Sequence, residues 1–300
     1  MEKQTAVRAK IALFFTALIW GSTFFVMKLV AGVFPTPFLM AIRFTSGTVA
    51  LALLFFPRLP RMREKRYLIA SFATGATQAL GYLLQTYGLA LDTSPGKSAF
   101  LTAAYCVLVP FLSWILLRRR PSGWQFFAAI ICVTGIGLLS LTEELTISPG
   151  DFLTLLGSII FALNILAIGR AGEQGCDPIL LTIGQLGVAS IISWGITLLT
   201  GAFPTNSPSP LSWWCLIGLG LVASALCMVM QSYGQQHVEA SQASILLSLE
   251  SVFGVVFSVL FYGESVTIRL LLGFVFIFAA IIISETKLEW LRRKPLQKQE

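Results

Sequence analysis

Polar side chains recur at steps of three and four residues within one long apolar stretch, residues 67–91. This stripe consists of Ser71, Thr74, Gln78, Tyr82 and Gln85. Residues three and four apart lie on the same face of an α-helix, so the spacing predicts a helix with one polar face. A long amide or a phenol in an apolar environment needs a hydrogen-bond partner and fits poorly into a tight helix seam. The stripe therefore predicts the lining of a polar cavity.

A second stripe, Ser98, Thr102 and Tyr105, follows within residues 95–117. The shift that aligns Tyr87 with Tyr233 places Gln78, Tyr82 and Gln85 on Ser224, Met228 and Gln231, and the second stripe on Ser244, Ser248 and Ser251. The predicted cavity residues are Gln78, Tyr82, Gln85, Thr102, Tyr105, Asn164, Gln231, Ser248 and Ser251. The alternative is that such side chains only join helices, through interhelical hydrogen bonds of about 1 kcal/mol. That alternative applies most to single serines and threonines, and least to the glutamines and tyrosines.

Four of the ionisable residues within or just inside the apolar stretches are singled out: Lys28, Arg43, Lys97 and Glu250. Glu250 lies near the middle of residues 240–262, where a bare carboxylate costs on the order of several kcal/mol, so it is a candidate proton-coupling site. The alternative for Glu250 is a permanently protonated carboxyl that donates one hydrogen bond to a neighbouring helix. Arg43 and Lys97 are further candidate charge sites. Lys28 and Lys97 can instead extend to the membrane interface, and Arg43 can instead bind helix-end carbonyls.

The tripeptide Ser94-Pro95-Gly96 opens the stretch that carries the second stripe. A helix N-terminus exposes free N–H groups and a partial positive charge, so together with Lys97 it is a candidate site for a carboxylate. Ordinary capping by Ser94, with Pro95 at the first helical position, is the compatible alternative.

Catalytic and metal-binding constellations are absent from the sequence. The only histidine is His237, and the five cysteines, Cys106, Cys132, Cys176, Cys215 and Cys227, show no Cys-x-x-Cys spacing. The apolar stretches hold no aspartate pair and no His-Glu metal motif. We therefore expect no enzyme, no cofactor, no metal site and no disulfide framework.

The elements that must position these residues follow from the composition: 56% of the 300 residues are hydrophobic and 12% are charged, with a mean hydropathy of +0.80. A soluble domain carries roughly 25% charged residues, so this is a membrane protein. A span needs roughly 20 apolar residues, which allows about ten spans, and stretches of this length favour helices over barrel strands. The predicted spans are residues 11–31, 35–56, 67–91, 95–117, 124–141, 151–169, 178–200, 211–236, 240–262 and 266–285.

Lysine and arginine are distributed unevenly between the two sets of connections. Apart from Lys28, Arg43, Lys97 and Arg269, they occur at the amino terminus, in residues 57–66, at 118–120, at Arg170 and after residue 285. The alternate connections, residues 32–34, 92–94, 142–150, 201–210 and 263–265, contain neither. Basic connections stay on the cytoplasmic side, so we predict that both termini are cytoplasmic. The net charge of +7 thus reflects topology and not nucleic-acid binding.

The two halves of the chain resemble each other weakly. The shift that aligns Tyr87 with Tyr233 also aligns the turn at Arg118 with the turn at Glu264, and a slightly shorter shift aligns Trp20 with Phe161. Each half has an odd number of predicted spans, so the second half must enter the membrane from the opposite side. We predict an all-α membrane protein of ten helices in two inverted five-helix repeats, residues 1–141 and 151–286, with a basic cytoplasmic tail at residues 287–300.

Several short motifs, in this order and spacing, resemble the drug/metabolite transporter superfamily and its EamA-type members. They are Ile19-Trp20-Gly21-Ser22-Thr23-Phe24, Ile42-Arg43-Phe44, Val107-Leu108-Val109-Pro110, Leu249-Glu250-Ser251-Val252-Phe253 and Tyr262-Gly263-Glu264. The resemblance covers almost the whole chain in two copies. It implies two inverted five-helix halves around a central cavity lined mainly by spans one, three, four, six, eight and nine. Glu250 fits the family pattern, whereas Ser251 stands where many relatives carry a proline.

The resemblance also implies export or exchange of metabolites, such as amino acids, or of drugs. We expect a secondary transporter of a small organic solute, an exporter working by alternating access in the inner membrane. The alternatives are a lipid flippase or a membrane receptor, with an intramembrane enzyme a distant third. The expected partners are the solute, the lipid bilayer and, through Glu250, protons; the expected assembly is a monomer or a homodimer, with no nucleic acid.

Overall fold

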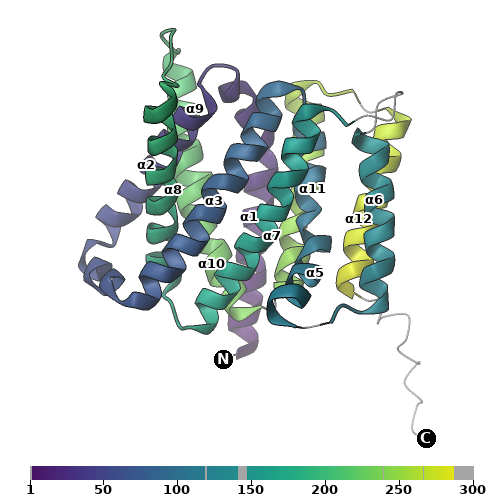
Figure 1. The fold of residues 1–300 in the computed structure, drawn as a ribbon, viewed down its shortest axis with the longest axis horizontal. Helices are drawn as coiled ribbons and strands as arrows, with labels where there is room; N and C mark the ends of the chain where they lie inside the picture. Colours follow the sequence, from purple (N-terminus) through teal and green to yellow (C-terminus); the bar gives the residue numbers. More distant parts are fainter. Residues whose placement is uncertain (1, 119, 141–146, 239, 266, 287–300) are drawn as a thin grey trace, which may run out of the picture.

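The computed structural model describes residues 2–118, 120–140, 147–238, 240–265 and 267–286, and these form a bundle of helices with short connections (Figure 1). The elements in chain order are α1 Glu2–Ala31, α2 Thr36–Leu54, η1 Phe56–Arg63, α3 Lys65–Leu91, α4 Pro95–Ala103, α5 Tyr105–Leu117, α6 Gly123–Ser140, α7 Pro149–Glu173, α8 Pro178–Thr200, α9 Pro210–Gly218, η2 Leu219–Leu226, α10 Cys227–His237, α11 Ala240–Phe257, η3 Ser258–Tyr262 and α12 Ile268–Thr286. The predicted helical character of the apolar stretches is confirmed.

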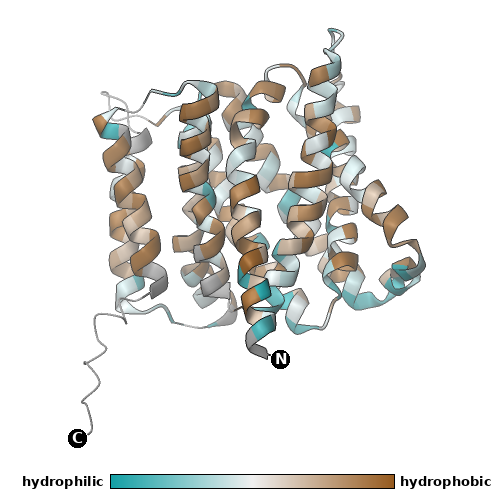
Figure 2. Cartoon of the chain, turned by 180° about the vertical axis from the view of Figure 1, so that it is seen from behind, coloured by the Kyte–Doolittle hydropathy of each residue, from teal (hydrophilic) through white to brown (hydrophobic). Residues whose placement is uncertain are grey.

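Among the described residues, six helical stretches are long and apolar enough to cross a membrane: Gln4–Ala31, Thr36–Leu54, Pro95–Leu116, Pro149–Glu173, Pro178–Thr200 and Pro210–His237. Shorter apolar helices occupy Gly123–Leu138, Leu246–Tyr262 and Leu271–Ile283. The 27 residues of α3 also have the length of a span, since a helix rises about 1.5 Å per residue, although the polar stripe makes α3 less hydrophobic. Hydrophobic residues recur along the length of the helices (Figure 2). The chain is a multi-pass, all-helical membrane protein.

Proline and a preceding polar residue start several of these helices. Proline is tolerated at the first helical position, where its missing N–H leaves no hydrogen bond unmade. Pro95, Pro149, Pro178 and Pro210 begin α4, α7, α8 and α9, and the preceding Ser94, Ser148, Asp177 and Ser209 accept hydrogen bonds from backbone N–H groups of the first turn. The expected capping by Ser94 is confirmed, and the start of each of these helices is fixed by local sequence.

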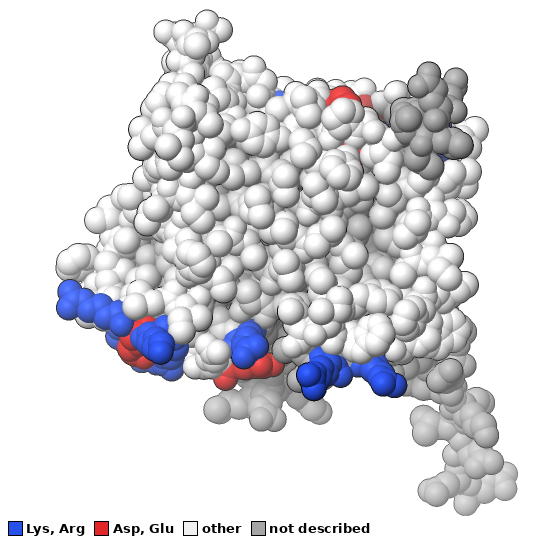
Figure 3. Space-filling view, viewed as in Figure 1, with Lys and Arg blue, Asp and Glu red and all other residues white. Residues whose placement is uncertain are grey.

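Lysine and arginine gather at the end of the bundle where α1 begins and α12 ends, which we call the basic end (Figures 1 and 3). The segment 57–66, expected to be a loop, contains the 3₁₀ helix η1 at this end, with Arg61 and Arg63 in its last turn. The opposite end holds the connections from α1 to α2, from α3 to α4 and from α8 to α9. The charge asymmetry predicted from the sequence is therefore a property of the folded surface.

Three of the predicted spans are less regular than the sequence suggested. The span at 95–117 divides into α4 and α5 at Ala104, whose N–H bonds to the carbonyl of Leu101 in a tight turn. The span at 211–236 contains the π-helical segment η2, and the span at 240–262 ends in the π-helical segment η3. π-Helical segments are rare and often occur at functional sites.

The segment η2 lies unusually close to α2. A Cβ atom at Gly47 would lie 2.8 Å from the carbonyl oxygen of Gly220, and a Cβ atom at Gly220 would lie 2.5 Å from that of Arg43. Only glycine permits such an approach of two backbones. This contact brings the side chain of Arg43 on α2 against η2, next to the cavity described below.

The packing partners define the architecture. Helix α3 packs on α7 and α8, α1 packs on α10 and α11, and α2 packs on α8 and η2. Helices α6 and α12 pair at one edge of the bundle (Figure 1). Helices from the two halves therefore alternate around the middle of the molecule.

Candidate substrate cavity

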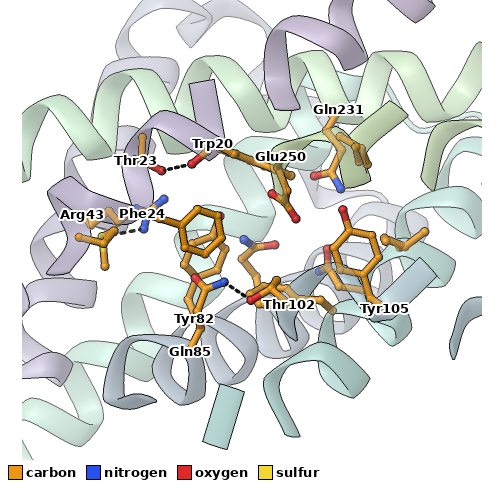
Figure 4. A pocket seen from close by; sticks show the side chains of 16 residues that line it. Trp20, Thr23, Phe24, Arg43, Tyr82, Gln85, Thr102, Tyr105, Gln231 and Glu250 are labelled. Atoms are coloured by element: carbon orange, nitrogen blue, oxygen red, sulfur yellow. Dashed lines mark hydrogen bonds between the residues drawn. The ribbon is translucent and has the colours of Figure 1, made fainter. Parts of the chain in front are cut away.

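A cavity with about 550 Å³ of empty space, including solvent at its opening, lies between helices of both halves (Figure 4). Its lining consists of Trp20, Thr23, Phe24, Met27, Arg43, Gln78, Tyr82, Gln85, Thr102, Tyr105, Phe161, Asn164, Ile165, Gln231, Leu247 and Glu250. These residues come from α1, α2, α3, α4, α5, α7, α10 and α11. The wall thus combines polar, charged and aromatic side chains.

The stripe on α3 divides between the cavity and helix packing. Gln78 and Gln85 line the cavity; Gln78 Oε1 accepts a 2.7 Å hydrogen bond from Gln185 Nε2, and Gln85 Nε2 donates one of 2.9 Å to Thr102 Oγ1. Thr74 does not line the cavity, and its hydroxyl donates to the Ala70 carbonyl one helical turn earlier. The glutamines are thus placed at the cavity wall with one partner each.

Asn164 on α7 also lines the cavity, and α3 holds its side chain in place. Its Nδ2 donates to the Thr74 carbonyl at 2.8 Å and to Thr77 Oγ1 at 2.9 Å. These two bonds use both amide hydrogens. The side chain therefore has only its carbonyl oxygen left for other interactions.

Tyr105, Gln231 and Glu250 form a second polar region of the wall (Figure 4). All three are buried, with exposed fractions of 3%, 3% and 4%. The Tyr105 hydroxyl and Gln231 Oε1 have no hydrogen-bond partner of good geometry in the part of the chain that the structure describes. Buried polar atoms are nearly always paired, so these atoms are candidates for contact with a bound solute.

Arg43 is fully buried in the wall, with 1% of its surface exposed. Its Nε donates to Ser224 Oγ at 2.8 Å, its Nη1 to Met27 Sδ at 3.3 Å, and its guanidinium carbon lies 4.4 Å from the centre of the Tyr82 ring. The alternative that Arg43 binds helix-end carbonyls does not apply among these contacts. Ser224 belongs to η2, so the π-helical segment positions one partner of the guanidinium.

Aromatic and aliphatic side chains complete the wall. Trp20 and Phe24 on α1 face the cavity together with Phe161 on α7, whose ring centre lies 5.1 Å from that of Tyr82. The indole N–H of Trp20 donates to the Ala223 carbonyl at 2.7 Å within η2. The cavity prediction did not include these residues. The alignment of Trp20 with Phe161 between the two halves was the available signal, since both occupy corresponding positions of the cavity wall.

Two predicted cavity residues on α11, Ser248 and Ser251, do not line the cavity. The cavity side of α11 carries Leu247 and Glu250. Successive helical residues are about 100° apart, so Ser248 and Ser251 lie on the adjacent face. The Ser251 hydroxyl donates at 2.7 Å to the Ser248 carbonyl and so contributes to local helix structure.

Lys97 also lies away from the cavity, at the end opposite to the basic end. Its Nζ lies 2.8 Å from Asp151 Oδ2 on α7, so it forms an ion pair instead of extending to the interface. Asp151 is completely buried and also accepts a 3.0 Å bond from Thr93 Oγ1. Lys28 on α1 donates to the carbonyls of Leu89 and Thr93 nearby.

The N-terminus of α4 is occupied by a carboxylate of the chain itself. Glu264, which follows η3, accepts a 2.9 Å bond from the Gly96 N–H and bonds from the hydroxyls of Ser94 and Ser258. The helix start thus binds an acidic group, as its exposed N–H groups favour. This group belongs to the second half of the chain, and the contact joins the halves at this end.

Comparisons with known proteins agree with this architecture. An uncharacterized transporter of Archaeoglobus fulgidus is 30% identical over 92% of this chain and 85% of its own length. An uncharacterized transporter of Bacillus subtilis is 23% identical over 93% of this chain and 97% of its own length. A biotin transporter of Escherichia coli K12 is 25% identical over 78% of each chain. A crystal structure with 16% identity aligns with 95% of this chain and 99% of its own, with a TM-score of 0.70, which shows the fold alone.

The model of the EamA-like transporter family matches residues 8–141 and again residues 148–286. The two matches cover both halves of the chain. The family consists of transporters and not of enzymes. The chain therefore belongs to the EamA-like transporter family, with two EamA domains.

Proposed function

We propose that this transporter moves a small organic metabolite or drug-like solute through the central cavity by alternating access. The observation that carries this proposal is the cavity itself, whose wall combines buried amides, a phenol, a carboxyl and a guanidinium with aromatic rings. Such groups in a membrane protein usually face a water-filled pathway. Purified protein in proteoliposomes is expected to exchange labelled amino acids, amines or nucleosides faster than protein-free vesicles. Equal rates for every class of solute would contradict the proposal.

The two domains, residues 1–141 and 151–286, are proposed to be inverted five-helix repeats. Reciprocal packing supports this proposal. Helix α3 of the first half packs on α7 of the second, and α10, which corresponds to α3, packs on α1, which corresponds to α7. Close backbone approaches also occur twice, at Gly47 and Gly220 between α2 and η2, and at Gly75, which lies against the Gln185 carbonyl, between α3 and α8. Two such halves can rock against each other around a fixed central site.

Contacts at the end opposite to the basic end support alternation between two states. The Lys97 to Asp151 ion pair joins α4 to α7, and Glu264 joins η3 to the N-terminus of α4. Alternating access requires that contacts of this kind form in one state and separate in another. These residues are therefore proposed to close one end of the pathway.

The similarity to a biotin transporter suggests one compound to test first. Biotin combines a carboxylate, a ureido group with donors and acceptors, and an apolar body, and the cavity wall offers Arg43, unpaired polar atoms of Tyr105 and Gln231, and aromatic rings. Stabilisation of the purified protein by biotin is expected in a thermal-shift measurement, because a ligand that binds the folded state raises its stability. A lack of any shift at millimolar biotin would exclude it as a tight ligand.

The proposed location is the inner membrane with the basic end in the cytoplasm, since basic connections remain on that side. The proposed direction is export, which rests on the family resemblance of the motifs. Everted membrane vesicles that contain the protein should accumulate the solute inside when energised, whereas right-side-out vesicles should not. A lipid-scrambling measurement on the same proteoliposomes separates solute transport from the flippase alternative.

A further inference from the structure

We propose that the cavity binds solutes through a carboxylate, which the guanidinium of Arg43 holds. This inference rests on the proposed transport function and narrows the class of substrate. It starts from a charged side chain that is almost completely buried, with 1% of its surface exposed, in the wall of the cavity.

The described contacts of Arg43 leave part of its hydrogen-bonding capacity unused. A guanidinium has five N–H donors in a rigid planar arrangement. Ser224 Oγ and the weak acceptor Met27 Sδ engage two of these five donors, one on Nε and one on Nη1. Paired N–H donors on the two Nη atoms match the two oxygens of a carboxylate.

The charge of Arg43 also lacks a partner. The ion pairs among the described residues join Arg58 with Asp177, Arg66 with Glu64, and Lys97 with Asp151. Glu250 lines the same cavity but forms no ion pair with Arg43 within this described set. A buried unpaired cation is costly in a membrane protein, so an anionic solute would gain from compensating it.

The rest of the wall favours a monoanion with an apolar or aromatic body. The cavity lining contains one guanidinium, so a dianion such as a phosphate monoester would leave negative charge uncompensated. Trp20, Phe24 and Phe161 supply contact surface for an aliphatic chain or a ring. The unpaired atoms of Tyr105 and Gln231 can bind a second polar group of the solute.

A purely structural role is the competing explanation for Arg43. Its bond to Ser224 and its position over the Tyr82 ring tie α2 to η2 and α3. That role predicts that substitution of Arg43 changes the stability of the protein but not its preference between an acid and a neutral ligand. The test therefore compares an acid with its own neutral amide, because their bodies are the same and only the carboxylate differs.

The probes are three matched pairs: hexanoate with hexanamide, phenylacetate with phenylacetamide, and indoleacetate with indoleacetamide. Apparent affinities come from the dependence of the melting temperature of the purified full-length protein on ligand concentration. At least one acid is expected to bind about tenfold or more tightly than its amide, the size of effect typical of charge-assisted hydrogen bonds. Arg43→Gln should abolish that preference, because it lowers the affinity for the acid far more than the affinity for the amide.

Two further variants keep the test decisive. Ser224→Ala removes the tether but not the charge, so it should lower stability and retain the preference for the acid. Arg43→Lys keeps the positive charge but loses the planar guanidinium, so it should show a smaller preference for the acid over the amide. This variant replaces Arg43→Gln if Arg43→Gln does not fold. The inference is overturned if no acid stabilises the wild type, or if the preference survives in Arg43→Gln, or if it is unchanged in Arg43→Lys. Proteoliposome flux of neutral or cationic solutes alone would leave the transporter proposal standing while overturning this inference.

Discussion

Glu250 and Arg43 are the acidic and the basic side chain of the described cavity wall, and they differ in what surrounds them. Arg43 has a hydroxyl, a thioether and a ring within contact distance. Glu250 shares its region of the wall with Tyr105 and Gln231, and no ion pair of Glu250 occurs among the described residues. Burial away from water favours the neutral, protonated form of a carboxyl over the anion. Glu250 can therefore lose its proton when the cavity opens to water.

Glu250→Gln tests whether this proton takes part in transport. The amide keeps the size and the hydrogen-bonding capacity of a protonated carboxyl but cannot gain or lose a proton at working pH. We expect gradient-driven transport to fall at least tenfold, equivalent to about 1.4 kcal/mol in activation free energy. Solute binding and exchange at equal pH should survive. Concentrative transport at the wild-type rate, with an unchanged dependence on pH, would assign Glu250 to helix packing.

Cysteine accessibility tests which side chains face the cavity. In a background without the native cysteines, Gln78→Cys and Gln231→Cys should react with a water-soluble thiol reagent, because both positions line the cavity. A bound solute should protect them. Ser248→Cys is the matched control on a polar position outside the cavity, and Leu199→Cys, at a residue that is 90% exposed on the outer surface, is the lipid-facing control. Equal reactivity at all four positions would return the glutamines to a packing role.

These residues show how far helical spacing alone can place a side chain. Gln78, Tyr82 and Gln85 share the side of α3 that lines the cavity, a relation that depends only on the 3.6-residue period, and their contact with a solute stays a prediction. Ser248 was misplaced because an alignment between two weakly similar halves fixes a position only to within a residue, which turns the side chain by about 100°. The cavity contact of Arg43 depends on how α2 is rotated against η2, which the sequence of α2 does not determine.

At the scale of elements, the helix ends were more predictable than the helix interiors. Polar caps followed by proline mark the starts of α4, α7, α8 and α9 in the sequence itself. The π-helical segment η2 has no such local signal. Its geometry arises from packing. The glycine contact with α2 lies in η2, and η2 also accepts hydrogen bonds from Trp20, at the Ala223 carbonyl, and from Arg43, at Ser224 Oγ.

The ion pair between Lys97 and Asp151 should contribute strongly to stability. The Asp151 side chain is 0% exposed and that of Lys97 is 22% exposed, so the pair is shielded from water. Removing one partner of a buried pair typically costs about 3–5 kcal/mol, because it leaves the other charge uncompensated. Lys97→Met should therefore lower the melting temperature of the purified protein more than Lys97→Met combined with Asp151→Asn. Additive effects of the two single substitutions would show that the groups do not interact.

The contact of Glu264 with α4 should control access to the cavity from the end opposite to the basic end. Hydrogen bonds to a charged acceptor contribute roughly 1.5–3 kcal/mol, compared with about 1 kcal/mol for neutral pairs. Glu264→Gln should thus shift the equilibrium toward the open state by about tenfold or less, and Glu264→Ala by more. Gly96→Ala should act in the same direction, since its Cβ would lie 2.7 Å from Glu264 Oε2.

The measurement is the rate at which an impermeant thiol reagent, added outside intact cells, modifies a cysteine at Gln231. Faster modification is expected in all three variants. An unchanged rate in Glu264→Ala would show that this contact does not close the pathway. Gly195→Ala is a suitable control, because a Cβ at Gly195 meets no atom within 4 Å.

At the scale of the whole molecule, the distribution of charge and the chain order together predict one orientation. Arg58, Arg61, Arg118, Arg120 and Arg170 are exposed at the basic end, while the connections at the other end lack lysine and arginine apart from those paired or bound near them. The orientation of a membrane protein follows the side on which such residues lie in short connections. The start of α1 and the end of α12 lie at the basic end, so the chain should have both termini in the cytoplasm.

Reporter fusions test this orientation directly. Alkaline phosphatase, which folds only in the periplasm, should be inactive when fused after Glu64, between η1 and α3, and active when fused after Asn206, between α8 and α9. Green fluorescent protein, which fluoresces only when it folds in the cytoplasm, should give the opposite result at the same two positions. A further fusion after Thr286, the end of α12, should resemble the one after Glu64. Phosphatase activity after Glu64 or Thr286 would reverse the orientation, and with it the assignment of the Glu264 contact to the outer end of the pathway.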